Sequence, residues 1–97
     1  MLLFVEFDIS ADIIDVPQSV IDDCENLSRR FLKWLFSPEV KPKYTVTLRG
    51  HTGVCYRSEA FVDFLNSNVL TDSKQKAKIV QQEIPRENIQ NLPSVFF

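Results

Sequence analysis

The sequence predicts an α+β protein with a ferredoxin-like βαββαβ arrangement, a two-layer sandwich of four antiparallel strands and two helices, followed by an extended C-terminal tail. Three observations predict this fold. The first ten residues have the pattern of a buried strand, residues 18–36 carry apolar side chains at helical spacing, and the later segments follow as strand, strand, helix and strand. Right-handed crossovers would place both helices on one sheet face and leave the other open.

We expect a single domain over residues 1–97, with a core of residues 1–84 and a tail of residues 85–97 that packs on the core or on a partner subunit. A chain of this length buries roughly 60 to 68% of its unfolded surface, which suffices for a core. The apolar share of 44% and the charged share of 25% are typical of globular proteins. The apolar clusters are too short to span a membrane and no signal-peptide pattern opens the chain, so we expect a soluble cytoplasmic protein without membrane contact.

The N-terminal half predicts a strand and then a long helix. Residues 2–5 are apolar on both faces, and the following residues alternate, as in a strand in the middle of a sheet. Residues 10–17 are expected to be a connection that places Pro17 in the first helical turn. The helix over 18–36 is amphipathic and ends before Pro38. Its apolar positions are Val20, Ile21, Cys24, Leu27, Phe31, Leu32, Trp34, Leu35 and Phe36.

A β-hairpin is expected next. Residues 43–48 alternate apolar and hydroxyl side chains, and residues 54–58 form a second short strand. If Val46 and Leu48 share a face with Val54, the loop between the strands has an odd number of residues. The sequence then predicts a three-residue loop, His51–Gly53, with Gly53 in the left-handed conformation and His51 exposed at the tip.

The last third predicts a helix, an edge strand and a tail. Ser58 is suited to cap a helix over 59–70, which Asn66–Asn68 loosens or ends. Residues 76–84 alternate poorly and are expected to form an edge strand. The final segment is expected to form one helical turn and then an extended aromatic end, which adds a strand or covers the open sheet face in this subunit or in a partner.

The charge distribution is asymmetric, although the net charge is only −2. Residues 1–27 contain seven acidic residues and no Lys or Arg, whereas residues 28–57 contain seven basic residues and only Glu39 as an acid. Such a pattern indicates either a surface for a partner or internal pairing, with the acidic start and basic end of one helix complementing its dipole.

The residue types that carry catalysis are sparse. Cys24 and Cys55 show no metal-ligand spacing and are interpreted as two buried thiols, while the only histidine, His51, is placed at a loop tip. A pair of His51 and Cys55 would not lie within hydrogen-bond reach. No cofactor, no metal and no catalytic residue is therefore predicted, which favours a non-enzymatic protein.

The stretch "RGHTGVCY" resembles a signature of the RNA-recognition-motif family, and "LFV" at residues 3–5 is similar to the start of that family's other signature. The matched positions in the first stretch are Arg49, Gly50, Val54 and Tyr56. This resemblance implies binding of single-stranded nucleic acid through the hairpin and the open sheet face. It also implies base stacking on Phe4, Tyr56 and His51, with Arg49 as a phosphate contact.

The stretch "FVEFDIS" is similar to the start of the CRISPR-associated metal-dependent nucleases, which have about this length. That resemblance implies that Asp8 binds a divalent ion between two subunits. The alternative interpretation is that Glu6, Asp8 and Asp12 form a solvated strand end.

The favoured function is a module that binds another protein or a second copy of itself, most simply as a homodimer. Trp34, Leu35 and Phe36 cannot all face one core, so at least one needs another covering surface, which a dimer or the folded-back tail would supply. Candidate binding residues are Arg49, His51, Tyr56, Arg57, Trp34, Phe96 and Phe97.

Overall fold

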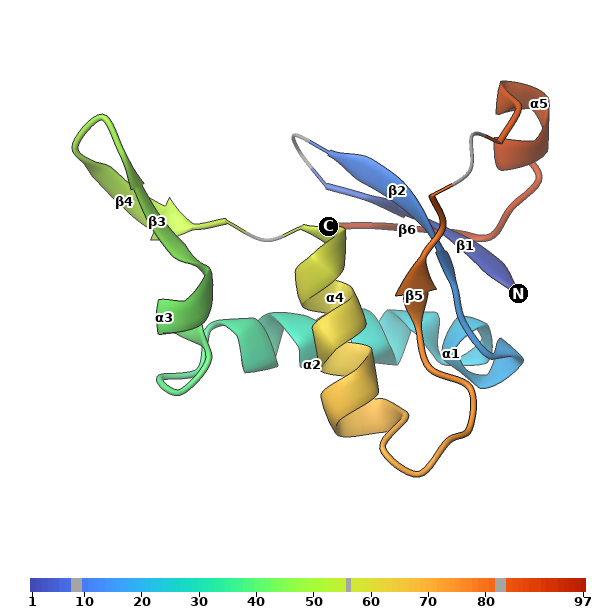
Figure 1. Cartoon of the computed structure of the whole chain (residues 1–97), viewed down its shortest axis with the longest axis horizontal. Coiled ribbons are helices and arrows are strands. Elements are labelled where there is room, and N and C mark those ends of the chain that lie inside the picture. Colours follow the sequence, from blue (N-terminus) through green and yellow to red (C-terminus); the bar gives the residue numbers. More distant parts are fainter. Residues whose placement is uncertain (8–9, 56, 82–83) are drawn as a thin grey trace.

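The computed structural model describes residues 1–7, 10–55, 57–81 and 84–97 and contains a four-stranded sheet and a separate two-stranded hairpin (Figure 1). The strand order in the larger sheet is β5-β2-β1-β6, and the hairpin consists of β3 and β4. The elements are β1 (Leu2–Glu6), β2 (Ala11–Asp15), α1 (Gln18–Asp22), α2 (Cys24–Leu35), α3 (Lys41–Tyr44), β3 (Thr45–Leu48), β4 (His51–Val54), α4 (Ser58–Phe64), the π-helix η1 (Leu65–Val69), β5 (Lys78–Ile79), α5 (Arg86–Ile89) and β6 (Ser94–Phe96).

The protein is a mixed α+β globule, but the ferredoxin-like arrangement is not confirmed, because strand order and helix placement differ. The second strand follows the first directly, without a helix between them. The hairpin expected at residues 43–58 exists, yet it forms its own small sheet. In the larger sheet, β1 has β2 on one side and β6 on the other instead.

The strand β2 lies where the sequence predicts a connection, and that prediction is wrong. It pairs antiparallel with β1, so that Leu3 lies opposite Ile14 and Phe4 opposite Ile13. Because side chains alternate along a strand, Ile14 faces the core and Ile13 the other side of the sheet. The acidic residues around them obscured this pattern; one of them, Asp15, accepts a hydrogen bond from the Met1 amine at 3.1 Å.

The central strand and the long amphipathic helix are confirmed, with a break in the helix. Asp23 has φ −116° and ψ 21°, outside helical values, and separates α1 from α2. Leu27, Phe31 and Leu35 are buried on one side of α2, at the spacing of one helical face. Ser37 then donates its hydroxyl to the Trp34 carbonyl at 2.6 Å, just after the helix ends.

The second long helix widens at the asparagines where the sequence predicts loosening. The Leu70 N–H donates to the Leu65 carbonyl, five residues back, as in a π-helix. The side-chain amide of Asn66 donates to the Ala77 carbonyl at 3.0 Å and accepts from the Ala77 N–H at 2.8 Å. These two bonds hold the segment that leads into β5. Ser58 is not a capping residue as expected, because it is the first residue of α4 and its hydroxyl makes no cap bond.

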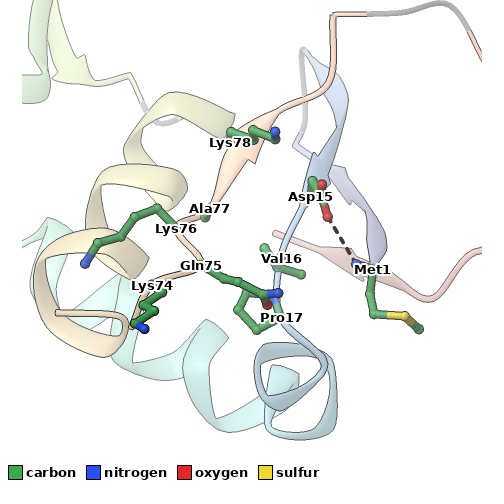
Figure 2. A pocket seen from close by; sticks show the side chains of 9 residues that line it. All are labelled: Met1, Asp15, Val16, Pro17, Lys74, Gln75, Lys76, Ala77 and Lys78. Atoms are coloured by element: carbon green, nitrogen blue, oxygen red, sulfur yellow. Dashed lines mark hydrogen bonds and ion pairs between the residues drawn. The ribbon is translucent and has the colours of Figure 1, made fainter. Parts of the chain in front are cut away.

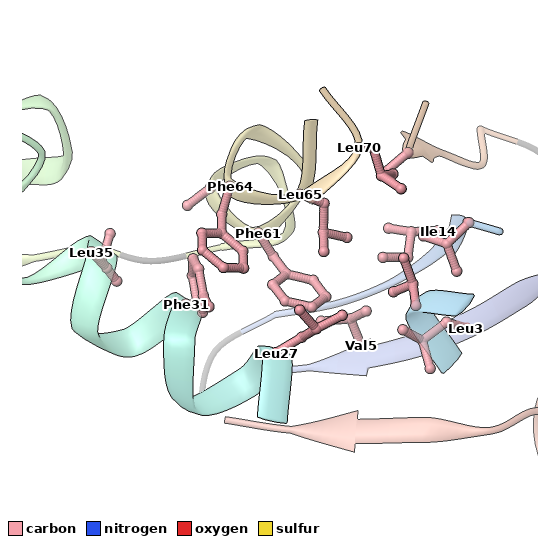
Figure 3. Packing of buried hydrophobic residues seen from close by; sticks show 14 of the residues in the cluster. Leu3, Val5, Ile14, Leu27, Phe31, Leu35, Phe61, Phe64, Leu65 and Leu70 are labelled. Atoms are coloured by element: carbon pink, nitrogen blue, oxygen red, sulfur yellow. The ribbon is translucent and has the colours of Figure 1, made fainter. Parts of the chain in front are cut away.

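Aromatic rings join the helices to the C-terminal strand. The ring of Phe31 lies 5.2 Å from those of both Phe61 and Phe97, measured between centroids, and Phe97 stacks on Phe7 at 4.9 Å. Figure 3 shows Phe31, from α2, and Phe61, from α4, directed into the space between the helices and the sheet. The strand β6 runs parallel to β1, with Val5 opposite Val95. The tail therefore adds a strand to its own subunit, one of the expected outcomes.

We predict that Phe97→Ala lowers the free energy of unfolding by about 2 to 3 kcal/mol, near the lower end for buried Phe→Ala changes because this ring is only half-buried. The matched control is Phe96→Ala, whose ring is 68% exposed and which should change stability by less than about 0.5 kcal/mol. Urea unfolding followed by tryptophan fluorescence measures both values. Equal losses in the two variants would contradict the packing of Phe97 in the core.

Candidate interaction surface

The β3–β4 hairpin stands away from the larger sheet at one end of the molecule (Figure 1). Each of its strands pairs only with the other within the part of the chain that the structure describes. Both outer strand edges therefore present unpaired backbone groups, which are a template for another chain.

Two contacts made by Tyr44 help to hold the base of the hairpin to the body. The Tyr44 hydroxyl donates to the Asp63 carboxylate on α4 at 2.8 Å, and the Tyr44 ring lies 5.9 Å from that of Trp34. The Cys55 N–H donates to the Tyr44 carbonyl at 2.8 Å and closes the hairpin below its first residue pair. Val54 also packs against the core, so the attachment lies at Tyr44 and Val54, and the outer part of the hairpin extends beyond them.

The turn has two residues, so the predicted three-residue loop at His51–Gly53 is wrong. Leu48 pairs with His51, which leaves Arg49 at φ 53° and Gly50 at φ 80° as the turn. Two successive residues with positive φ are typical of a type I′ turn, whose twist matches that of the strands. Glycine adopts such a φ without strain, whereas arginine seldom does, which explains why the sequence pointed to Gly53 instead.

This register gives the hairpin one face with exposed apolar side chains. Val46 lies opposite Gly53 and Leu48 opposite His51, and the two apolar side chains are 50% and 71% exposed. The other face carries hydroxyls, including the pair Thr47 and Thr52 at 2.9 Å. A shallow depression of about 740 Å³ is lined by residues of both hairpin strands. Sequence alternation shows that these apolar positions share one face of the strand, but not what covers that face.

The hairpin segment is also strongly basic. Residues 41–57 contain Lys41, Lys43, Arg49 and Arg57 and no acidic residue. All four are exposed, and the ion pair found among the described residues is a different one, between the Met1 amine and Asp15. The four cationic groups of the hairpin segment therefore form no ion pair with a carboxylate among the residues that the structure describes.

The predicted binding residues are only partly brought together. Arg49 and His51 are exposed at the outer end of the hairpin, and Arg57 is exposed just before α4. Trp34 is half-buried against Tyr44 and Phe64, and Phe97 lies against the aromatic core. Phe96 is exposed, but it lies on β6, in the other sheet. Tyr56 lies outside the described residues.

The structure does not bring together the residues that resemble the RNA-recognition motif, nor does it describe the one that resembles the nuclease metal ligand. Phe4 is half-buried on β1 in the larger sheet, whereas His51 lies on β4 in the hairpin, so a shared stacking surface for bases is not formed by these two. Asp8, the metal ligand of the nuclease interpretation, lies outside the described residues. Within the described ranges, no group of three or more His, Cys, Asp or Glu side chains is close enough to hold a metal ion.

A second hollow of about 540 Å³ lies beside the start of β1 and carries three lysines, Lys74, Lys76 and Lys78 (Figure 2). The Lys76 ammonium donates to the carbonyls of Leu70 and Thr71, and the nearby Asp15 carboxylate is engaged by the Met1 amine. Two of the charged groups that line this hollow, Lys76 and Asp15, are thus engaged by the chain itself.

The free thiol of Cys24 offers little nucleophilic chemistry. Cys24 and Cys55 are both half-buried. Burial raises the pKa of the Cys24 thiol, and a hydrogen bond with Ser28 opposes this only in part. A thiol with a raised pKa stays protonated at neutral pH and is a poor nucleophile.

Comparison with known proteins yields no relative: no family model matches the chain, and neither the curated proteins nor the solved structures contain a match. None of the helices in the described ranges is long and apolar enough to cross a membrane. Function is therefore argued from the surface itself.

We predict that Tyr44 titrates with a pKa of about 12, raised from 10.0 by burial and then by the Asp63 carboxylate. Ultraviolet titration of a Tyr56→Phe background isolates this phenol. Asp63→Asn should lower the pKa only part of the way, because burial, the larger cause, remains. Stability contributed by neutral Tyr44 is complete below pH 10 and declines as the pH rises through about 12. A midpoint near 10 with Asp63 present would contradict the contact.

Proposed function

We propose that this protein is a non-enzymatic binding module that contacts another protein, or a second copy of itself, through the β3–β4 hairpin. The observation that carries the proposal is the exposure of Val46 and Leu48 on a two-stranded sheet that the body does not cover. Burial of such side chains by a partner releases about 25 cal/mol per Å² of apolar surface. The free strand edges would add backbone hydrogen bonds to the same contact.

A protein partner suits this surface better than a nucleic acid. A base-stacking platform needs aromatic rings, and the described side chains that point outward on the hairpin include His51 but no Phe or Trp. An apolar pair such as Val46 and Leu48 gains most from a dry, apolar counterpart on another protein. The four cations of the hairpin segment then favour a partner with carboxylates at the rim.

The unpaired cations also give a second candidate, binding of single-stranded nucleic acid through phosphate contacts. Its support is limited to Lys41, Lys43, Arg49 and Arg57, which lie on or beside the hairpin. The overall charge of −2 adds no general attraction for a polyanion. Anisotropy of labelled mixed-sequence RNA and DNA at two salt concentrations tests this candidate, since phosphate contacts weaken steeply with salt.

Quantitative affinity capture tests the protein-binding proposal with wild type and a Val46→Ser/Leu48→Ser variant as bait. Both side chains are at least half exposed, so the variant should unfold within about 0.5 kcal/mol of wild type. Wild type should retain a partner, which is either a different protein or a second copy of this chain. The variant should retain at least about tenfold less of that partner, which is the effect of losing about 1.4 kcal/mol of binding free energy.

The matched control is Leu32→Ser, which removes an apolar side chain that is 38% exposed on α2. It should retain the same protein as wild type. An identical set of bound proteins for wild type and the hairpin variant would contradict the proposed function.

A further inference from the structure

We infer that the occupant of the hairpin is a second copy of this chain, which receives it at the junction of α1 and α2. This inference rests on the proposed function, because it names the partner of the same hairpin. It is argued from charge complementarity within the chain, from the position of the two surfaces, and from the apolar groups at each of them.

The receiving surface is acidic. Asp22, Asp23 and Glu25 are exposed around the break between α1 and α2. Asp22 accepts a hydrogen bond from the Gln18 amide at 2.9 Å, and Asp23 from the Asn26 amide at 3.1 Å. Both donors are neutral, so these bonds leave the negative charges uncompensated.

The same surface is hollowed and partly apolar. A depression of about 430 Å³ lies among the three carboxylates, with the half-buried Ile21 and Cys24 also lining it and Arg29 as its one cation. Leu48 at the end of β3 and the cations beside it therefore have matching groups at the junction, an apolar lining and a net negative rim. Specific interfaces combine an apolar centre and a charged rim in this way.

The two surfaces of one molecule lie apart. Figure 1 shows the hairpin at one end of the long axis and α1 toward the other end, in a molecule that extends over 40 Å. One copy therefore cannot place its hairpin on its own junction. Two copies side by side in opposite directions would each place a hairpin on the other's junction, which forms a closed two-fold dimer.

Pairing of two hairpins with each other is the less favourable arrangement. It would bring Lys43 and Arg49 of both copies together, and like charges in an interface oppose binding. Docking on the junction instead brings the basic segment 41–57 against the acidic segment that contains Asp22, Asp23 and Glu25. The basic segment of one subunit then attracts the acidic segment of the other.

A charge swap tests this arrangement by sedimentation equilibrium of the full chain at micromolar concentration and low salt. The hairpin variant is Lys43→Glu/Arg49→Asp, where Asp tolerates the positive φ of the turn. The junction variant is Asp22→Lys/Glu25→Lys. The matched control is Lys74→Glu/Lys78→Glu, which changes the net charge as much as the hairpin variant does but at a hollow that shares no lining residue with the hairpin or the junction depression.

Wild type and the control should have twice the monomer mass of 11.2 kDa. Each of the two test variants alone should associate at least about tenfold more weakly, because its two surfaces then carry like charges. An equimolar mixture of both should recover the dimer, since each hairpin again meets a junction of opposite sign. Circular dichroism confirms folding, and the neutral pairs Lys43→Gln/Arg49→Asn and Asp22→Asn/Glu25→Gln should show smaller losses.

Three results would overturn the inference: a monomeric wild type, a junction variant that dimerises like wild type, or a mixture of folded variants that stays monomeric. If wild type is monomeric but affinity capture finds a different protein that depends on Val46 and Leu48, the proposed function stands and only the identity of the partner fails. If no captured protein depends on these side chains, both fail.

Discussion

The fold depends on one aromatic contact, in which the Phe31 ring on α2 meets Phe61 from α4 and Phe97 from the end of the chain. These rings come from segments far apart in the sequence, and their edge-to-face packing adds to the gain from burying them. The contact closes the helical layer over β1 and places the last strand beside it. A two-stranded or three-stranded sheet alone would bury too little apolar surface for a chain of this length.

The hairpin lies outside this cluster. Its base is held by Tyr44, which connects the Trp34 ring to Asp63, but its outer residues Val46 and Leu48 have no covering element. The body buries most of its large apolar side chains, with Phe36 and Phe96 more than half exposed, and a basic, partly apolar arm is exposed as well. A protein that exposes such a surface generally uses it for a contact with a partner.

The sequence predicts the elements better than their assembly. The run at β1, the amphipathic α2 and the edge position of β5 follow from local patterns, and the structure contains each of them. The strand β2 was missed because acidic residues flank Ile13 and Ile14. Alternation in β3 predicted a strand with one apolar face, but it could not reveal whether any other element covers Leu48. The turn was expected at His51–Gly53 instead of Arg49–Gly50, because the positive φ of Arg49 could not be foreseen for an arginine.

Native-state amide hydrogen exchange by NMR tests most directly whether the aromatic cluster unites the body and leaves the hairpin independent. The account predicts that the Phe97 N–H, which donates to the Glu6 carbonyl, exchanges as slowly as the amides of β1, through global unfolding. Amides of the β3–β4 ladder should exchange faster, through a separate local opening. Fast exchange at Phe97, or hairpin amides as slow as those of β1, would contradict this account.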